Sequence, residues 1–376
     1  MDVVDRPQAF SLEERARRYS ILRDQMKDRG IDVLLAVGRD CHAGRGDLRY
    51  IAGYSPLVMT HYAILPRVAA EPIFLAPSRN RGRRVEASGW IKEVRSGWVG
   101  LEDTMLDEIA GFLDGGAIGI ARHSNLPVPV YLALCERFGA ERVQDAGKMM
   151  DEVRMVKGAE ELRCAREAGR IADLGYQVMK ERVRPGVVDA DFYAAAVESE
   201  FRAGTEYTMD LMGLDGASVS APSGYVVTED SFVEGELTPT YLGVYNQLPY
   251  DFGFGQAARD RAKALEVARA AYDAMLASIR PGVRVPELYE AARQPIESAG
   301  LICQHGQFGH GMGFDVVEGF SIIPEHDVEL RQGMLFVVHP IIGTKTGTRV
   351  LLGATVAVTA DGYELMNETD GWAFSS

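Results

Sequence analysis

Apolar and polar residues follow two patterns along the chain, and the first pattern covers residues 1–150. Ser11 and Glu14 form a capping box that predicts the start of a helix, which runs to about Asp28 and is stopped by Gly30. Short apolar runs predict five strands, at 32–37, 61–67, 72–77, 91–96 and 117–122. Helical stretches are expected near 102–113 and 128–138. This alternation predicts an α/β domain over residues 1–150.

From Lys157 onward the apolar residues recur three and four positions apart, which predicts a long amphipathic helix, and a second one is expected near 257–279. Each helix precedes one copy of a repeat. The copies begin at Arg184 and Arg280, 96 residues apart, and share Arg-Pro-Gly-Val, a tyrosine, an Ala-Ala pair and a closing Ala-Gly. Residues 151–376 are therefore predicted to form a second domain of two related halves. A site is expected between the halves, because concave pockets form at such junctions.

Composition narrows the class of protein. The 376 residues carry a formal net charge of −14 and are 47% hydrophobic, the balance of a globular protein with a sizeable core. No block of basic residues is present, which argues against nucleic acid and anionic membranes as partners. No apolar run has the length of a membrane span, and the first residues lack the pattern of a signal peptide. The chain has no CxxC pair among Cys41, Cys135, Cys164 and Cys303. We therefore expect reduced thiols and a cytoplasmic protein.

The segment FVVHPIIG, residues 336–343, places His339 at the end of a strand that is expected to be buried. The proline that follows cannot continue a sheet ladder. His305 and His310 come shortly before, among glycines that let the backbone approach a ligand or another strand. Histidine is the usual proton carrier near neutral pH, so His310 and His339 are candidate catalytic residues. The alternative is that His339 is a satisfied core residue in a pocket that has decayed.

The segment Gly309–Gly343 resembles the creatinase / aminopeptidase P / prolidase family through Gly-His-Gly-x-Gly-x-Asp-Val and a later Gly-Met-x-Phe. The end of the chain, 355–367, matches the last strand and turn of that family. The resemblance extends over the whole chain and is stronger over 155–376. It implies an α+β fold, with an N-terminal creatinase-like α/β domain at 1–150 and a C-terminal pita-bread domain at 151–376 built from two pseudo-symmetric halves. It also implies a homodimer.

Peptidases of this family hold two divalent metals with two Asp, one His and two Glu. The aligned positions here carry His310, His339, either Gly353 or Leu351, Tyr241, and either Phe252 or its neighbour Asp251. Two hard cations need several carboxylate oxygens, and this set offers at most one carboxylate. We therefore expect no metal and no other cofactor.

On these grounds the expected function is a metal-independent hydrolase of a small-molecule C–N bond. His310 and His339 would be acid and base, with Asp251 as their orienting carboxylate. Their pKa values are expected to be split, leaving one imidazole neutral and one able to donate. Tyr241 and Arg349 would stabilise developing negative charge. Three alternatives stay open: a lyase that abstracts a proton from a small carbonyl substrate, a peptidase with one metal on His310, His339 and Asp251, and a non-catalytic binding protein.

The substrate is expected to be a small neutral or anionic molecule. Creatine is a poor candidate, because the acidic pair that would hold its guanidinium is missing, whereas Tyr225, Tyr241 and Arg349 suit the opposite charge. The basic segment 38–50 is interpreted as solvated surface. An arginine of that segment, or His61, is a candidate for completing the pocket of the neighbouring subunit in a dimer.

Overall fold

The computed structural model describes residues 10–39, 44–54, 58–88, 90–216, 219–344 and 349–375. The chain divides into two compact units, residues 1–154 and 155–376. The domain boundary predicted after residue 150 lies inside helix α6 (Gly147–Met155). Within the described residues, no helix combines the length and the apolar character needed to cross a membrane.

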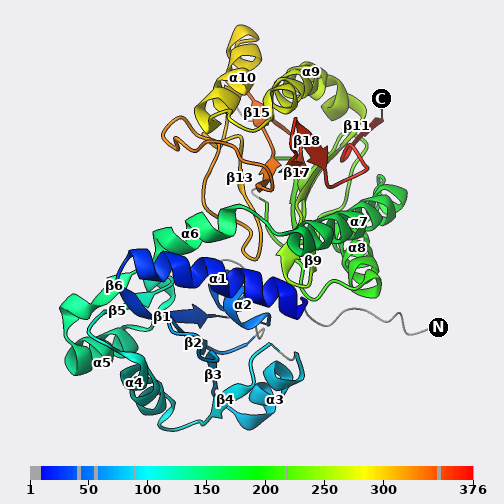
Figure 1. The fold of residues 1–376 in the computed structure, drawn as a ribbon. Helices are drawn as coiled ribbons and strands as arrows, with labels where there is room; N and C mark the ends of the chain where they lie inside the picture. Colours follow the sequence, from blue (N-terminus) through cyan, green and yellow to red (C-terminus); the bar gives the residue numbers. More distant parts are fainter. Residues whose placement is uncertain are drawn as a thin grey trace. The chain divides into compact units, whose positions relative to one another are not determined.

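The N-terminal unit is built on one mixed sheet with the strand order β4-β3-β2-β1-β5-β6 (Figure 1). The strands are β1 (Ile31–Gly38), β2 (His61–Pro66), β3 (Ile73–Ala76), β4 (Glu93–Ser96), β5 (Ala117–Ile120) and β6 (Val143–Asp145). The central strand β1 pairs antiparallel with β2 and parallel with β5, and all its residues are buried. The five predicted strands are therefore confirmed, and β6 was missed.

The helices of this unit are α1 (Leu12–Asp28), α2 (Gly46–Ala52), α3 (Arg79–Ser88), α4 (Leu101–Phe112), α5 (Val128–Phe138) and α6. The Ser11 hydroxyl accepts a hydrogen bond from the Glu14 amide at 3.1 Å, which caps α1 as predicted. The interpretation of 38–50 as solvated surface is wrong for most of the segment. Every residue of α2 is buried, and so is Arg45 before it. His42 lies outside the described residues.

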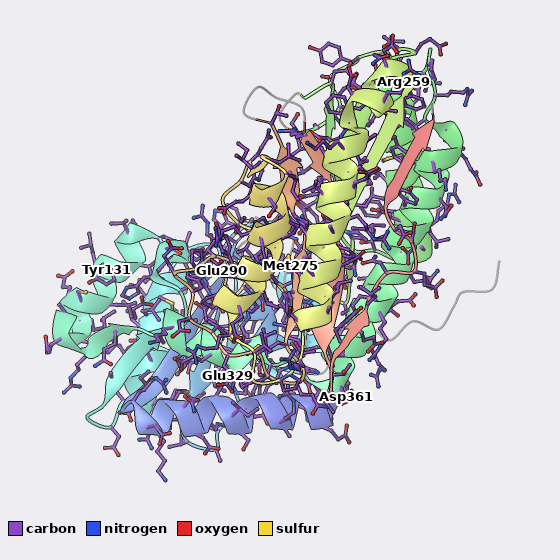
Figure 2. The ribbon with its side chains drawn as sticks, turned by 90° about the horizontal axis from the view of Figure 1, so that it is seen from above. Tyr131, Arg259, Met275, Glu290, Glu329 and Asp361 are labelled. Atoms are coloured by element: carbon purple, nitrogen blue, oxygen red, sulfur yellow. The ribbon has the colours of Figure 1, made fainter. Side chains whose placement is uncertain are left out.

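The C-terminal unit contains two helix pairs that repeat the predicted offset. The pairs are α7 (Ala159–Arg182) with α8 (Asp189–Ala203) and α9 (Gly255–Ser278) with α10 (Val285–Ser298). Helices α7 and α9 both have 24 residues and begin 96 positions apart, as the repeat requires. Figure 1 shows the two pairs in green and yellow. Figure 2 shows α9 and α10 side by side, with Met275 on the first and Glu290 on the second.

Each helix pair belongs to its own sheet system. The first half has the sheet β19-β11-β8-β7, formed by β7 (Leu211–Leu214), β8 (Phe232–Leu237), β11 (Leu248–Phe254) and the last strand, β19 (Trp372–Ser375). Between β8 and β11 lies a small hairpin of β9 (Thr240–Tyr241) and β10 (Val244–Tyr245). The second half has two sheets, β12-β15-β16 and β13-β14-β17-β18. Their strands are β12 (Ile302–Cys303), β13 (Gly309–Gly311), β14 (Leu335–Val338), β15 (Ile341–Gly343), β16 (Arg349–Leu351), β17 (Ala354–Val358) and β18 (Tyr363–Leu365). The predicted fold class is confirmed: an α+β chain whose α/β domain precedes two related halves.

Candidate functional site

The two candidate histidines meet in the second half of the C-terminal unit. His310 lies in β13, which pairs antiparallel with β14, and His339 follows the last residue of β14. Their ring centroids are 5.1 Å apart with an interplanar angle of 72°. Strand β14 is buried along its whole length, and the rings beside it are buried too: His310 is 5% exposed and His339 is 4% exposed. The sequence-based expectation that they lie together therefore has direct geometric support.

The hydrogen bonding of the two rings is unequal. Nδ1 of His310 lies 3.2 Å from the carbonyl oxygen of Gly311. By contrast, neither ring nitrogen of His339 has a hydrogen-bond partner among the described residues. The alternative that His339 is a satisfied core residue is therefore not what the structure shows. Buried polar atoms without partners are rare in native proteins, and each calls for a water, a ligand or a catalytic role.

Burial controls the charge of both rings. It lowers the pKa of His310 to about 4, because a charged imidazole is poorly solvated there. It lowers the pKa of His339 well below its ordinary value, and the nearby His310 and His305 lower it further. The expected split of the two pKa values stays a prediction, but burial disfavours the charged form of both rings, including the one that was expected to donate a proton. At neutral pH the pair is a set of two neutral imidazoles.

A second cluster of charges lies between the first-half sheet and α9. Asp251 in β11 stands opposite Glu234 in the neighbouring strand β8. The guanidinium of Arg261 in α9 binds Asp251 through both nitrogens, with Nη1 donating to Oδ1 at 2.7 Å. Arg349 in β16 donates to Glu234. Both carboxylates are thus paired with arginines. The Arg261–Asp251 pair is bidentate, which is the geometry that a guanidinium group favours with a carboxylate.

This cluster is fixed by further contacts. Nε of Arg261 donates to the carbonyl oxygen of Arg349 at 2.7 Å, and its guanidinium lies 3.9 Å from the centroid of the Phe232 ring. The amide of Leu351 donates to Oδ2 of Asp251 at 3.2 Å. Asp251 makes no hydrogen bond to either histidine in the part of the chain that the structure describes. The expected role of Asp251 as the orienting carboxylate of the histidines is thus corrected: its oxygens are engaged by Arg261 and by the backbone.

A small cavity of about 50 Å³ opens beside this cluster. Its polar lining consists of Glu234, Glu236, His305 and Arg349. Burial raises the pKa of Glu234 and of Glu236 to about 7. Ile341, two residues after His339, is also part of the wall. His305, which lines the cavity, also contributes to lowering the pKa of His339.

The other predicted site residues lie elsewhere. Tyr225 is 58% exposed and Tyr241 is partly buried in β9; neither is part of the described cavity wall. His61 is fully buried in β2 of the N-terminal unit, where its Nδ1 lies 3.2 Å from the Met59 carbonyl oxygen. Burial lowers the pKa of His61 to about 4. The substrate-binding roles of these three residues stay predictions.

Three residues of this region escaped the sequence-based prediction: Glu234, Glu236 and Arg261. A signal for the first two was present, since acidic residues at alternate positions of a strand lie on one face. Arg261 gave no such signal, because a charged residue in a long amphipathic helix is normally solvated. Its burial depends on Asp251, a contact between two elements that the sequence pattern does not reveal.

Known proteins resemble this chain over both units. The description "Metallopeptidase family M24" matches residues 163–360, and "Creatinase/Prolidase N-terminal domain" matches residues 18–156. An Xaa-Pro dipeptidase from Lactobacillus helveticus is 24% identical over 341 residues, which cover 86% of this chain and 90% of that protein. A probable dipeptidase PepE from Mycobacterium bovis is 25% identical over 370 residues, 95% of this chain and 96% of its own.

Solved structures show the same fold. A prolidase from Thermococcus sibiricus superposes with a TM-score of 0.83 at 18% identity, covering 98% of this chain and all of that chain. A prolidase from Pyrococcus horikoshii gives a TM-score of 0.80 at 19% identity, covering 94% of this chain and 98% of that chain. The predicted combination of a creatinase-like N-terminal domain and a pita-bread domain is therefore confirmed.

A metallopeptidase family implies a divalent metal, and the described donors do not fit one. No group of three or more His, Cys, Asp or Glu side chains in the described ranges is arranged to hold a metal ion. Asp251 and Glu234 are engaged by arginines, and Gly353 offers no ligand. A Cβ atom at position 353 would collide with the Val338 carbonyl oxygen and with the backbone of His339.

The comparisons nevertheless contradict one expectation from the sequence. A metal-independent hydrolase of a small-molecule C–N bond was expected, whereas the matching family is one of metallopeptidases and the relatives named above are dipeptidases. The coarser expectation of a hydrolase agrees with these relatives. Because the family match spans residues 163–360, more than half of the sequence, the chain belongs to metallopeptidase family M24.

Proposed function

We propose that the C-terminal unit hydrolyses the amide bond of a short peptide. Support for this substrate class comes from the dipeptidases that resemble the chain over most of its length. Within the chain itself, the proposal is carried by His339. This buried imidazole has two ring nitrogens without partners among the described residues and lies next to His310. Such a group is poised to bind a water molecule or a substrate.

In this proposal His339 takes a proton from the attacking water and returns it to the leaving amine, as the amide C–N bond breaks and a C–O bond forms. Its low pKa makes the free imidazole a weak base. The negative charge of the tetrahedral intermediate would raise that pKa during the reaction, because an opposite charge nearby favours the charged ring. Arg349, which donates to Glu234 and lines the cavity, is the cation that would stabilise the same intermediate in this proposal.

The test is an assay of the purified chain against a panel of Xaa-Pro and other dipeptides. Each reaction is run with chelator and with added Mn²⁺, Co²⁺ or Zn²⁺, and the released amine is measured. We expect His339→Ala and His310→Ala to lower kcat/KM at least 100-fold in variants that are still folded at the assay temperature. The exposed His326 supplies the control variant His326→Ala. Absence of hydrolysis in every condition, or full activity of His339→Ala, would contradict the proposal.

A second candidate function is the binding of short peptides without turnover. One observation favours it: Asp251 and Glu234 are neutralised by Arg261 and Arg349, so these two carboxylates are not available to activate water. Titration calorimetry separates the two functions. Heat of binding that saturates without product formation would favour the binding protein, whereas a steady release of amine would favour the hydrolase.

The proposal includes a cytoplasmic homodimer. Its support is the family resemblance, in which the N-terminal domain of one subunit reaches the pocket of the other. Light scattering after size exclusion measures the oligomeric state directly. A mass of one chain at micromolar concentration would remove this part of the proposal and would leave the site in the C-terminal unit unaffected.

A further inference from the structure

We infer that Glu236 binds the cationic ammonium group of the ligand, such as the free amino terminus of a short peptide. The inference rests on the proposed function, because it names the substrate group that the same region recognises. It is drawn from the balance of charges around the cavity, from the hydrogen-bonding capacity left there and from the size of the space.

The charges of this region do not cancel. Glu234 and Glu236 occupy alternate positions of β8, so their side chains lie on one face, and Asp251 stands opposite Glu234. Arg261 pairs with Asp251, and Arg349 pairs with Glu234. When all five groups are ionised, three negative charges face two positive charges. Buried charges are normally paired, and Glu236 is partly buried, so one further positive charge would complete the set.

Glu236 is the group that lacks this charge. It lines the cavity and forms no ion pair within the described part of the chain. In the free protein burial raises its pKa to about 7, and a hydrogen bond from the Gln247 side chain only partly opposes this. The neighbouring Glu234 also lines the cavity and is 1% exposed, and its Oε2 has no hydrogen-bond donor among the described residues. An ammonium group carries three N–H donors and would supply both the missing charge and the missing donors.

The space also favours an ammonium group. A cavity of about 50 Å³ admits a group the size of a few water molecules and excludes a whole peptide. A divalent cation would need several oxygen ligands, and two of the three carboxylates are already engaged by guanidinium groups. The wall of the cavity includes Ile341 from the segment that carries His339. A ligand anchored by its amino terminus at Glu236 would therefore contact the segment that follows His339.

The experiment is a calorimetric titration of the full chain with three ligands. These are an Xaa-Pro dipeptide with a free amino terminus, the same dipeptide after N-acetylation, and an analogue with a hydroxyl in place of the amino group. The catalytically impaired His339→Ala background prevents turnover during the titration. We expect the free amine to bind at least tenfold more tightly than either neutral analogue.

In Glu236→Gln the preference should fall to less than twofold, because the isosteric amide cannot pair with a cation. The matched control is Glu198→Gln on the exposed face of α8, which should keep the full preference. Equal binding of all three ligands to the His339→Ala protein with Glu236 intact would overturn the inference and leave the proposed function standing. A preference that survives in Glu236→Gln would also overturn it. If no ligand binds and the wild-type chain releases no amine from any dipeptide, both the inference and the proposed function fail. Because the three-ligand comparison needs no variant of Glu236, the inference stays testable even if Glu236→Gln does not fold.

Discussion

The two halves of the C-terminal unit have equivalent helix pairs, but the polar and charged residues buried against those helices differ. Positions 96 residues apart carry the same buried residue at Tyr176 and Tyr272, and again at Met179 and Met275. Other equivalent positions differ sharply. Glu200, 0% exposed in α8, corresponds to the buried Ile296 in α10. The shared helix packing thus depends on the equivalent buried residues that the halves have in common. The buried charged groups lie at equivalent positions where the residues differ.

Because of these residue differences, the stability of each half depends on a different kind of interaction. The second half has a large core of apolar side chains from α9, α10 and the strands, and His310 and His339 lie at its margin. The first half buries Glu200 and Asp210 as well as the ion-paired Asp251 and Glu234. Its stability should therefore depend on protonation and on counterions. One of those counterions, Arg261, comes from the helix of the second half, at the position equivalent to Ala165.

The largest expected effect concerns this borrowed counterion. Arg261→Met removes the guanidinium and leaves Asp251 and Glu234 buried without their shared cation. Breaking a buried ion pair from one side costs about 3–5 kcal/mol in the free energy of unfolding. Urea unfolding measures the loss. In hydrogen exchange it should appear in the β8 and β11 amides of the first half, not only in α9.

The matched control is Arg269→Met on the same helix. Arg269 forms an exposed pair with Asp273 at 3.0 Å, and such surface pairs contribute less than about 1 kcal/mol. A loss for Arg261→Met as small as that of the control would show that the first half does not depend on this charge.

Most of the fold could be predicted from the sequence, because periodicity and the 96-residue repeat are local signals that survive in one chain. Residues that depend on contacts between elements could not be predicted. Arg261 looks like any solvated helix residue until Asp251 is placed beside it. The histidine pair was found because His310 and His339 each follow a local signal, glycine turns and a strand end. The lowering of both pKa values could not be predicted, because burial of both rings is a property of the assembled sheets.

The next largest effect is the acid sensitivity of the second half. The pKa of His310 is about 4 in the folded chain, below the ordinary value of 6.5. A depressed pKa means that the unfolded state binds the proton more readily. His310 therefore contributes stability that is present above about pH 6.5 and is lost as the pH falls towards 4, by about 3 kcal/mol over that range.

Replacing the ring tests this sign. His310→Gln should flatten the fall of the unfolding free energy between pH 6.5 and 4, as measured by urea titrations at several pH values. His326→Gln, at an exposed position of the same unit, should retain the wild-type slope. An unchanged slope in His310→Gln would mean that the ring is not buried in its neutral form.

The first half should respond in the opposite direction. Burial raises the pKa of Glu200 well above its ordinary value and raises that of Asp210 as well, and Asp210 raises the pKa of Glu200 further. Carboxyls with a raised folded-state pKa contribute stability that is present below about pH 4.5 and is lost as the pH rises through the folded value. Ionisation of one such group lowers stability by up to about 1.4 kcal/mol per pH unit.

Glu200→Gln should therefore reduce the loss of stability on raising the pH from 5 to 9. The loss that remains is expected from the other carboxyls with raised pKa values, Asp210, Glu234, Glu236 and Asp251. Glu198→Gln, two residues earlier on the exposed face of α8, is the matched control and should leave the slope unchanged. A steeper alkaline loss in Glu200→Gln would reverse the assigned direction of the Glu200 pKa.

The smallest expected effect tests whether the halves are interchangeable at one contact. Gly175 in α7 is equivalent to the buried Ala271, and a Cβ atom at Gly175 would lie 2.7 Å from Oε1 of Glu200. In the second half the facing position is Ile296, and Ala271 is accommodated there. Alanine inside a helix is favoured over glycine by about 0.5–1 kcal/mol. Gly175→Ala alone should gain less than this or destabilise the chain, because the Glu200 carboxylate must move.

Combined with Glu200→Ile, the same substitution should yield the full gain, since the pair then reproduces Ala271 and Ile296. A double-mutant cycle by urea unfolding measures the difference as a coupling energy. Strict additivity of the two substitutions would mean that the Glu200 side chain does not oppose a methyl group at position 175, and it would contradict this prediction.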